Sequence, residues 1–290
     1  PLYSSAASDV YKRQGLTEYD QAVQYFTEAL ELSDGWVQNV DYDMNYYLAA
    51  AYRKNGQPAE AKKVYDAILG LKPEEKDAYF LRGSAELELG DYESAKADFD
   101  KAISMDPKNY DRLIEIYEAL ADYGYREVGQ EYLQNVLNTD KKLDAYDSGR
   151  IYYYLGDYQK AYLALEEAKG KGGVDSYLYL GKAYAATGDY NYASSVYSNY
   201  LSKQGPDAEI YNQLGLCELA KKDYQKALEA FQAGKQIEGN SLMQTLSFNE
   251  IVAYEYLQDY QKAAVLLKAY LQNYPDDQAA IREQQFLSTR

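Results

Sequence analysis

The sequence predicts an all-α solenoid of stacked antiparallel helix pairs, and two observations carry this prediction. A six-residue motif of the form Gly-Asp-Tyr-x-x-Ala recurs along the chain, with spacings between 32 and 39 residues. Small and large residues keep fixed distances from each copy of the motif. A repeat of this length holds two helices, and one pair alone cannot bury its apolar stripe. Neighbouring pairs must therefore stack into a continuous core.

The motif marks the turn between the two helices of each pair. Its glycine supplies the backbone conformation that closes the first helix, and its aspartate caps the second helix. The clear copies lie at 56–61, 90–95, 156–161 and 188–193, the weaker ones at 17–22, 222–227 and 258–263, and a degenerate one at 124–129.

Each pair also sets a small residue of the first helix against a large residue of the second. The small residue lets the second helix approach closely, and the large residue fills the adjoining space. The small residues are Ala49, Gly83, Gly149, Gly181 and Gly215, and the large ones are Phe26, Tyr65, Phe99, Leu133, Leu165, Tyr197, Phe231 and Leu267. Second helices are expected to end before Pro73, Pro107 and Pro275, because proline cannot continue a helix.

Together these features resemble the tetratricopeptide repeat over residues 17–277. The resemblance implies a right-handed superhelix over 15–277, with one half-repeat at 15–34 and seven full repeats. The full repeats are expected to begin near residues 42, 76, 110, 142, 174, 208 and 244. Residues 278–290 are expected to form a capping helix in which Ala280, Ile281 and Phe286 cover the last repeat.

Residues 1–14 lack the repeat pattern. Asp9 to Gln14 read D-V-Y-K-R-Q, which matches one reading frame of the transposon end used in preparing sequencing libraries. We interpret residues 1–14 as a non-native, sequencing-derived segment and expect the chain to be truncated at its N-terminus. A natural, disordered N-terminus is the alternative. The half-repeat lacks its leading helix, which agrees with a truncated start.

The fourth repeat departs from the size pattern. Tyr117 stands at the small first-helix position, and Gly129 stands at the alanine position of the second helix. Glycine inside a helix costs about 1 kcal/mol relative to alanine. We therefore expect this repeat to be the least stable internal one.

The composition excludes several classes of chemistry. The 290 residues include no histidine and one cysteine, so a Ser-His-Asp triad, a histidine-ligated zinc and an intrachain disulfide are all excluded. The 30 basic and 46 acidic residues give a net charge of −16, which opposes binding to nucleic acid or anionic lipid. No apolar run approaches the length of a membrane span. We expect no cofactor and no metal site.

The resemblance implies a concave groove, lined by the first helices, that holds an extended peptide or a partner helix. Arg150 and Lys182 occupy equivalent places in consecutive repeats, and neighbouring helices lie close enough for both to contact one anionic group of a ligand. The alternative is that each simply pairs with nearby acidic residues. The groove positions carried over by repeat position are Tyr46, Arg53, Phe80, Tyr146, Arg150, Tyr153, Leu178, Lys182, Phe248 and Tyr256.

The leading functional hypothesis is a non-catalytic scaffold, expected to be bacterial, that binds a protein or peptide in this groove. One alternative is the peptide-sensing regulatory half of a larger protein whose effector domain stood upstream. Another is a surface lipoprotein that has lost its anchor. The choice between a cytoplasmic location and an anchored one at the cell surface therefore stays open.

Overall fold

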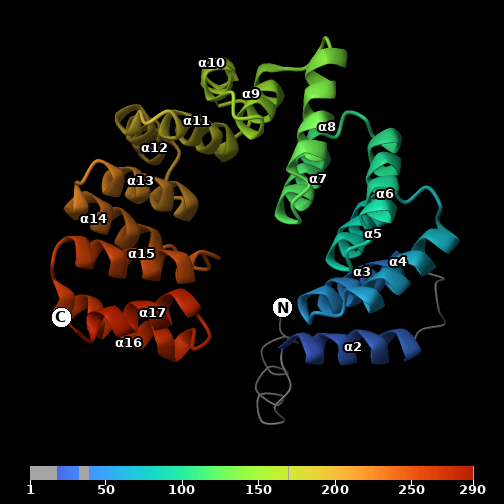
Figure 1. The fold of residues 1–290 in the computed structure, drawn as a ribbon, viewed down its shortest axis with the longest axis horizontal. Coiled ribbons are helices and arrows are strands. Elements are labelled where there is room, and N and C mark those ends of the chain that lie inside the picture. The colour runs from blue at the N-terminus through green and yellow to red at the C-terminus, as the bar shows by residue number, and fades with distance from the viewer. Residues whose placement is uncertain (1–17, 33–38, 169, 290) are drawn as a thin grey trace. The chain divides into compact units, whose positions relative to one another are not determined.

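A computed structural model describes residues 18–32, 39–168 and 170–289 of the chain. The described residues form sixteen α-helices and no strand (Figure 1). They divide into two compact units, unit 1 up to Val136 and unit 2 from Leu137 onward. The prediction for residues 1–14 lies outside the described residues, as do the first and last residues of the half-repeat.

Successive helices are joined by short turns and pack against one another in pairs. Those of unit 1 are α2 (Glu18–Leu32), α3 (Asn39–Lys54), α4 (Pro58–Leu71), α5 (Lys76–Glu88), α6 (Tyr92–Met105), α7 (Tyr110–Asp122) and α8 (Arg126–Thr139), which runs into unit 2. Those of unit 2 are α9 (Ala145–Tyr154), α10 (Tyr158–Ala168), α11 (Val174–Ala186), α12 (Tyr190–Lys203), α13 (Ala208–Ala220), α14 (Tyr224–Lys235), α15 (Met243–Tyr256), α16 (Tyr260–Asn273) and α17 (Gln278–Leu287). The odd-numbered helices from α3 to α15 are called the first helices below. The predicted α-solenoid of helix pairs is confirmed for the described residues.

The Gly-Asp turn works as its sequence suggests. Gly90 adopts a left-handed backbone with φ of 78°, which glycine tolerates at little cost. The following Asp91 accepts a hydrogen bond from the Ser94 backbone N–H at 3.2 Å, and so caps α6. Gly188 (φ 84°) and Asp189 repeat this arrangement at the start of α12.

Two copies of the turn keep the left-handed backbone without a glycine. Lys222 and Gln258 have φ of 65° and 63°. A side chain in this conformation costs about 1–2 kcal/mol, whereas glycine loses roughly 0.5–1 kcal/mol more conformational entropy on folding. The cost of the side chain exceeds that of glycine by about 0.5–1 kcal/mol, so the turns at Lys222 and Gln258 are strained.

Replacing Lys222 with glycine is therefore expected to raise the free energy of unfolding by about 0.5–1 kcal/mol, and Gln258→Gly to do the same. Both side chains are exposed, so no packing is lost. Chemical denaturation followed by circular dichroism measures the change. Gly188→Ala is the matched control and should destabilise the protein, because it creates the same strain. A loss of stability in Lys222→Gly would contradict this account.

The paired small and large residues pack as closely as predicted. A Cβ atom added to Gly181 would lie 2.3 Å from Cζ of Tyr197, and one added to Gly215 would lie 2.3 Å from Cε1 of Phe231. Both rings are completely buried. The two helices of each of these pairs approach to a separation that only glycine permits.

The fourth repeat places a large residue on its first helix and a glycine at the alanine position of its second helix. Tyr117 of α7 is 4% exposed, although it stands where the other repeats have a small residue. A Cβ atom on Gly129 of α8 would lie 2.9 Å from Cδ2 and 3.1 Å from Cα of Tyr117. Gly129 therefore makes room for the tyrosine. The lower stability expected for this repeat stays a prediction.

The C-terminal helix α17 begins at Asp277, whose side chain accepts hydrogen bonds from the backbone N–H groups of Ala279 and Ala280. Ala280 and Leu287 are buried against α15 and α16. The expectation for Phe286 is wrong, since this side chain is 40% exposed. Leu287 follows Ala280 by seven residues and so lies on the same helix face, whereas Phe286 is rotated away from it.

Candidate peptide-binding surface

All ten predicted binding residues lie on first helices. Tyr46 and Arg53 of α3 and Phe80 of α5 belong to unit 1, and the other seven belong to α9, α11 and α15 of unit 2. Their exposure differs widely, because Tyr256 is 55% exposed whereas Arg150 is only 7% exposed. The remaining eight are half-buried.

Arg150 and Lys182 each have a carboxylate partner within the protein. Nη2 of Arg150 lies 2.5 Å from Oδ1 of Asp147, and its guanidinium stacks 4.4 Å from the ring centre of Tyr146. Nζ of Lys182 lies 3.4 Å from Oε1 of Glu209. This is the arrangement that the ion-pair alternative describes. A shared anionic ligand at these two residues stays a prediction.

The neighbouring predicted residues of unit 2 also make packing contacts. Gly172 fits closely against the Tyr146 ring, because a Cβ atom there would lie 2.4 Å from Cε2 of Tyr146. The Tyr153 ring packs edge-on against Tyr154 and Tyr179 at centroid distances of 5.5 and 5.6 Å. Tyr146 and Tyr153 therefore contribute to helix packing, in addition to any contact that they make with a ligand.

Phe248 and Tyr256 of α15 also contact other aromatic rings. Phe248 is tilted against the largely buried Tyr270 at a centroid distance of 5.7 Å. Tyr256 stacks on Tyr224 at a centroid distance of 4.9 Å, and 55% of its surface stays exposed to solvent. Tyr256 is thus the most accessible of the predicted binding residues.

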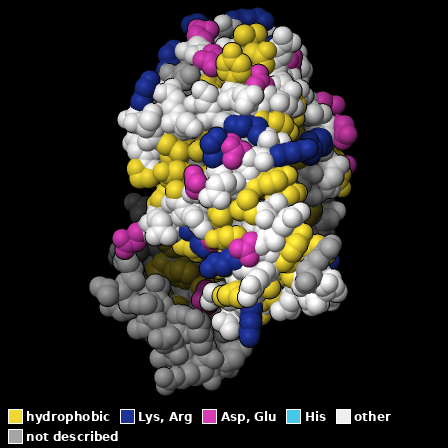
Figure 2. Space-filling view, turned by 90° about the vertical axis from the view of Figure 1, so that its left-hand side faces the viewer, with side chains coloured by type: hydrophobic (Ala, Val, Ile, Leu, Met, Phe, Trp, Pro, Cys, Tyr) yellow, Lys and Arg dark blue, Asp and Glu magenta, His cyan; other side chains and the backbone are white. Residues whose placement is uncertain are grey.

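Tyrosine rings also form stacks between a first helix and the second helices beside it. Tyr184 lies between Tyr162 and Tyr192, at centroid distances of 4.7 and 5.4 Å. Figure 2 shows one face of the molecule, on which hydrophobic side chains gather in patches separated by charged ones. Much of the tyrosine excess in the sequence thus serves packing between adjacent helices.

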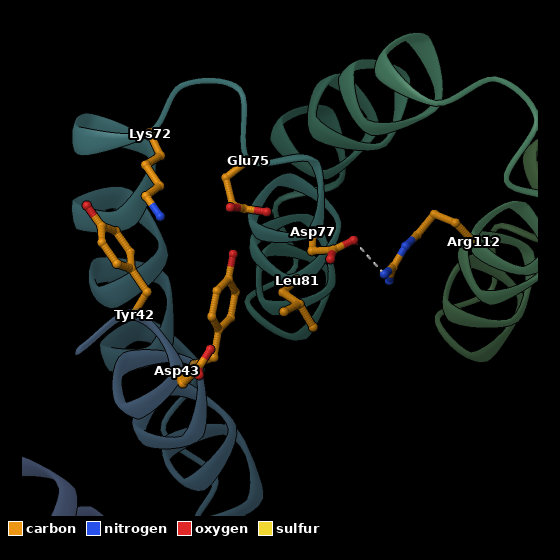
Figure 3. Close-up of a pocket in the computed structure, with 8 residues that line it drawn as sticks. Tyr42, Asp43, Lys72, Glu75, Asp77, Leu81 and Arg112 are labelled. Atoms are coloured by element: carbon orange, nitrogen blue, oxygen red, sulfur yellow. Dashed lines mark hydrogen bonds and ion pairs between the residues drawn. The ribbon is translucent and has the colours of Figure 1, made fainter. Parts of the chain in front are cut away.

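In unit 1 the first helices α3, α5 and α7 border a cavity of about 590 Å³, called the α3–α5 cavity below. The side chains that line it are Tyr42, Asp43, Tyr46, Lys72, Glu75, Asp77, Leu81 and Arg112. Figure 3 shows Glu75 reaching into the space between α3 and α5, with Leu81 one turn along α5 from Asp77. A volume of this size is typical of sites for small ligands or single side chains.

The two cations of the cavity are already engaged. Nζ of Lys72 lies 3.5 Å from the centre of the Tyr42 ring. Arg112 donates from Nη2 to Asp77 at 2.9 Å, as Figure 3 shows, and its Nη1 lies 2.9 Å from Glu115. The guanidinium of Arg112 also stacks on the Phe80 ring at 4.0 Å. Phe80 thus acts here by holding Arg112 in place.

Tyr46 is the predicted residue that reaches the cavity. Its hydroxyl oxygen is buried and has no hydrogen-bond partner among the described residues. Burial raises the pKa of this hydroxyl well above its usual value, and the charges of Glu75 and Asp77 raise it further. The phenol therefore stays neutral at physiological pH and can both donate and accept a hydrogen bond.

Sequence reasoning found Tyr46 but missed the charged residues around it. Lys72 and Glu75 lie in the connection between α4 and α5, outside the repeated motif, and Asp77 and Arg112 stand in the first turns of α5 and α7. A signal was present, because Glu75 and Asp77 flank the start of a first helix. Acidic residues are common there for purely structural reasons.

No group of three or more candidate ligands for a metal ion is found among the described residues. Burial raises the pKa of Cys217 to about 12, so its thiol is protonated at neutral pH. None of the described helices has both the length and the apolar character that a membrane span requires.

Comparison with known sequences finds one family. Sequence models of the tetratricopeptide repeat match residues 46–110, 178–241 and 248–277, which together exceed half of the chain. Tetratricopeptide repeat protein 21B of Xenopus laevis is 27% identical over 95% of this chain, which spans 19% of that protein. The heat shock protein STI1 of Saccharomyces cerevisiae is 27% identical over 36% of this chain and 18% of its own length. The chain thus spans less than a fifth of each of these relatives.

Solved structures share the fold at low identity. A tetratricopeptide repeat protein from Parabacteroides merdae superposes with a TM-score of 0.53 at 15% identity, over 87% of this chain and 97% of that one. The Cut9–Hcn1 hetero-tetramer of the APC/C contains a chain that superposes with a TM-score of 0.51 at 16% identity, over 98% of this chain and 58% of that one. At this identity the likeness concerns the fold alone.

Proposed function

Because this chain belongs to the tetratricopeptide repeat family, we propose that it holds a peptide segment or a partner helix against its first helices. The family's fold generally serves protein–protein interaction, and its members are generally not catalysts. For this chain we propose in addition that the first-helix face is the surface that binds, and that the chain has no catalytic activity of its own.

The observation that carries the proposal is the character of the first-helix face in each unit. In unit 1 this face has the α3–α5 cavity, with a buried tyrosine hydroxyl that lacks a partner. In unit 2 it exposes Tyr256 on α15. Aromatic residues of this kind contribute large contact area at low entropic cost and are enriched where proteins bind one another. The Cut9–Hcn1 structure is itself an assembly of two different proteins.

Selection of a displayed random dodecapeptide library on the intact chain tests the proposal. The enriched peptides are synthesised with a benzophenone side chain, crosslinked to the protein by light, and mapped by mass spectrometry. We expect crosslinks to α3, α5, α7, α9, α11, α13 or α15.

A pair of matched variants checks the face in the same experiment. For peptides that crosslink to α15, Tyr256→Ala is expected to weaken binding at least tenfold. Tyr192→Ala on the second helix α12 should leave it unchanged, although Tyr192 is 62% exposed and also stacked on another tyrosine. Crosslinks confined to second helices, or no enriched peptide at all, would contradict the proposed function.

A further inference from the structure

We propose that the α3–α5 cavity receives an arginine or lysine side chain of a bound peptide. This inference rests on the proposed function and specifies the chemistry of the partner at one place. It is carried by the balance of charge in the cavity, by the buried hydroxyl of Tyr46 and by the apolar wall beside them.

The charge balance favours a cation. Three carboxylates and two cations line the cavity. Asp77 is paired with Arg112, and the ammonium group of Lys72 faces the Tyr42 ring. Neither Asp43 nor Glu75 forms an ion pair or a side-chain hydrogen bond with any described residue. A ligand cation would give Glu75 the partner that it lacks.

The hydroxyl of Tyr46 adds a directional contact. A buried hydroxyl without a hydrogen bond carries a desolvation penalty that a ligand donor can remove. An ammonium or guanidinium group has several N–H donors, so it can donate to a carboxylate and to this oxygen at once. The rings of Tyr42 and Tyr46 and the side chain of Leu81 supply an apolar surface for the methylene stem of such a residue.

An anionic ligand fits the same cavity poorly. Arg112 is held by Asp77 and Glu115, each at 2.9 Å, and its planar group is stacked on Phe80. A carboxylate or phosphate would have to displace these contacts and would lie beside Asp43 and Glu75. The basic side chain is therefore the occupant that the geometry favours.

Leu81 supplies a reporter inside the cavity. In protein labelled with ¹³C at the leucine methyl groups, the signal lost in Leu81→Ile identifies this residue. Titration with acetyl-Gly-Arg-Gly-amide is expected to shift the Leu81 signals in a saturable way, and added NaCl should weaken the binding. The peptide with citrulline in place of arginine has nearly the same shape without the charge. It should bind at least tenfold more weakly.

Variants of the protein separate the cavity from the net charge. Glu75→Gln is expected to weaken arginine-peptide binding at least tenfold, whereas Glu74→Gln, an exposed neighbour outside the cavity, should leave it unchanged. Tyr46→Phe should weaken binding without lowering the unfolding temperature, because the hydroxyl has no partner in the free protein.

Several results would overturn the inference. These are equal shifts with arginine and citrulline peptides, a preference for acetyl-Gly-Glu-Gly-amide, no response of Leu81 to any peptide, or equal loss in Glu74→Gln and Glu75→Gln. If display-selected peptides still crosslink to first helices in that event, the proposed function stands and only the chemistry assigned to this cavity fails. If no peptide binds at all, both fail.

Discussion

Replacing Tyr117 with alanine is expected to lower the free energy of unfolding by about 3–4 kcal/mol. The side chain is 4% exposed and fills the space that Gly129 leaves beside α8. Denaturant unfolding monitored by circular dichroism gives the value. Tyr117→Phe is the matched control. It removes only the hydroxyl, which accepts a 3.3 Å hydrogen bond from Nη1 of Arg126, and should cost about 1 kcal/mol or less.

Substitution of Gly129, the residue that faces Tyr117, tests this contact from the other helix. By helix propensity alone, Gly129→Ala should stabilise α8 by about 1 kcal/mol. We expect destabilisation instead, because the added Cβ would lie 2.9 Å from the ring and 3.1 Å from the backbone of Tyr117. In the Tyr117→Ala background the same change should become stabilising, because the clash is gone. The same sign for Gly129→Ala in both backgrounds would show that the two residues are not coupled.

Replacing Gly215 with alanine is expected to cost about 2 kcal/mol after the better helix propensity of alanine is counted. The added Cβ would lie 2.3 Å from Cε1 of Phe231, and this ring is fully buried, so it has no open space to move into. Gly181→Ala, against Tyr197, should behave alike. The measurement is again the free energy of unfolding.

Gly70→Ala is the control for these glycines. Gly70 lies near the end of α4, is exposed, and has no atom within 4 Å of an added Cβ. Its replacement should leave stability unchanged or raise it by up to about 1 kcal/mol. The double variant Gly215→Ala, Phe231→Leu replaces the facing ring with a smaller side chain and should recover part of the lost free energy of unfolding. If Gly215→Ala proves as harmless as Gly70→Ala, the close contact does not limit stability.

The fold was predictable because its determinants recur. The turn at Gly90 and Asp91 uses one residue for a left-handed backbone and the next for a cap, and the same pair appears again along the chain. The pairing of a small residue with a large one was also predictable, because Gly181 and Tyr197 occupy the same repeat positions as Gly215 and Phe231. Repetition turns weak local signals into a strong one.

Features that occur only once in the chain could not be predicted from repetition. Tyr117 and Gly129 look like two separate departures in the sequence and become one compensated contact only in space. The α3–α5 cavity depends on Lys72 and Glu75, which lie between helices and outside the repeated motif. On α17 the rotation of one residue decided that Leu287 rather than Phe286 is buried, and helix periodicity fixes that rotation only when the starting residue is known.

The repeated turn also bears on how such a chain can change its length. The turns that start at Gly188 and Lys222 share the same backbone conformation and the same aspartate cap, and one full helix pair separates them. Unequal recombination between the two DNA segments would delete or duplicate one complete pair and leave a normal turn at the junction. Because contacts in unit 2 run mainly between neighbouring helices, the number of pairs can drift during evolution while the local packing rules persist.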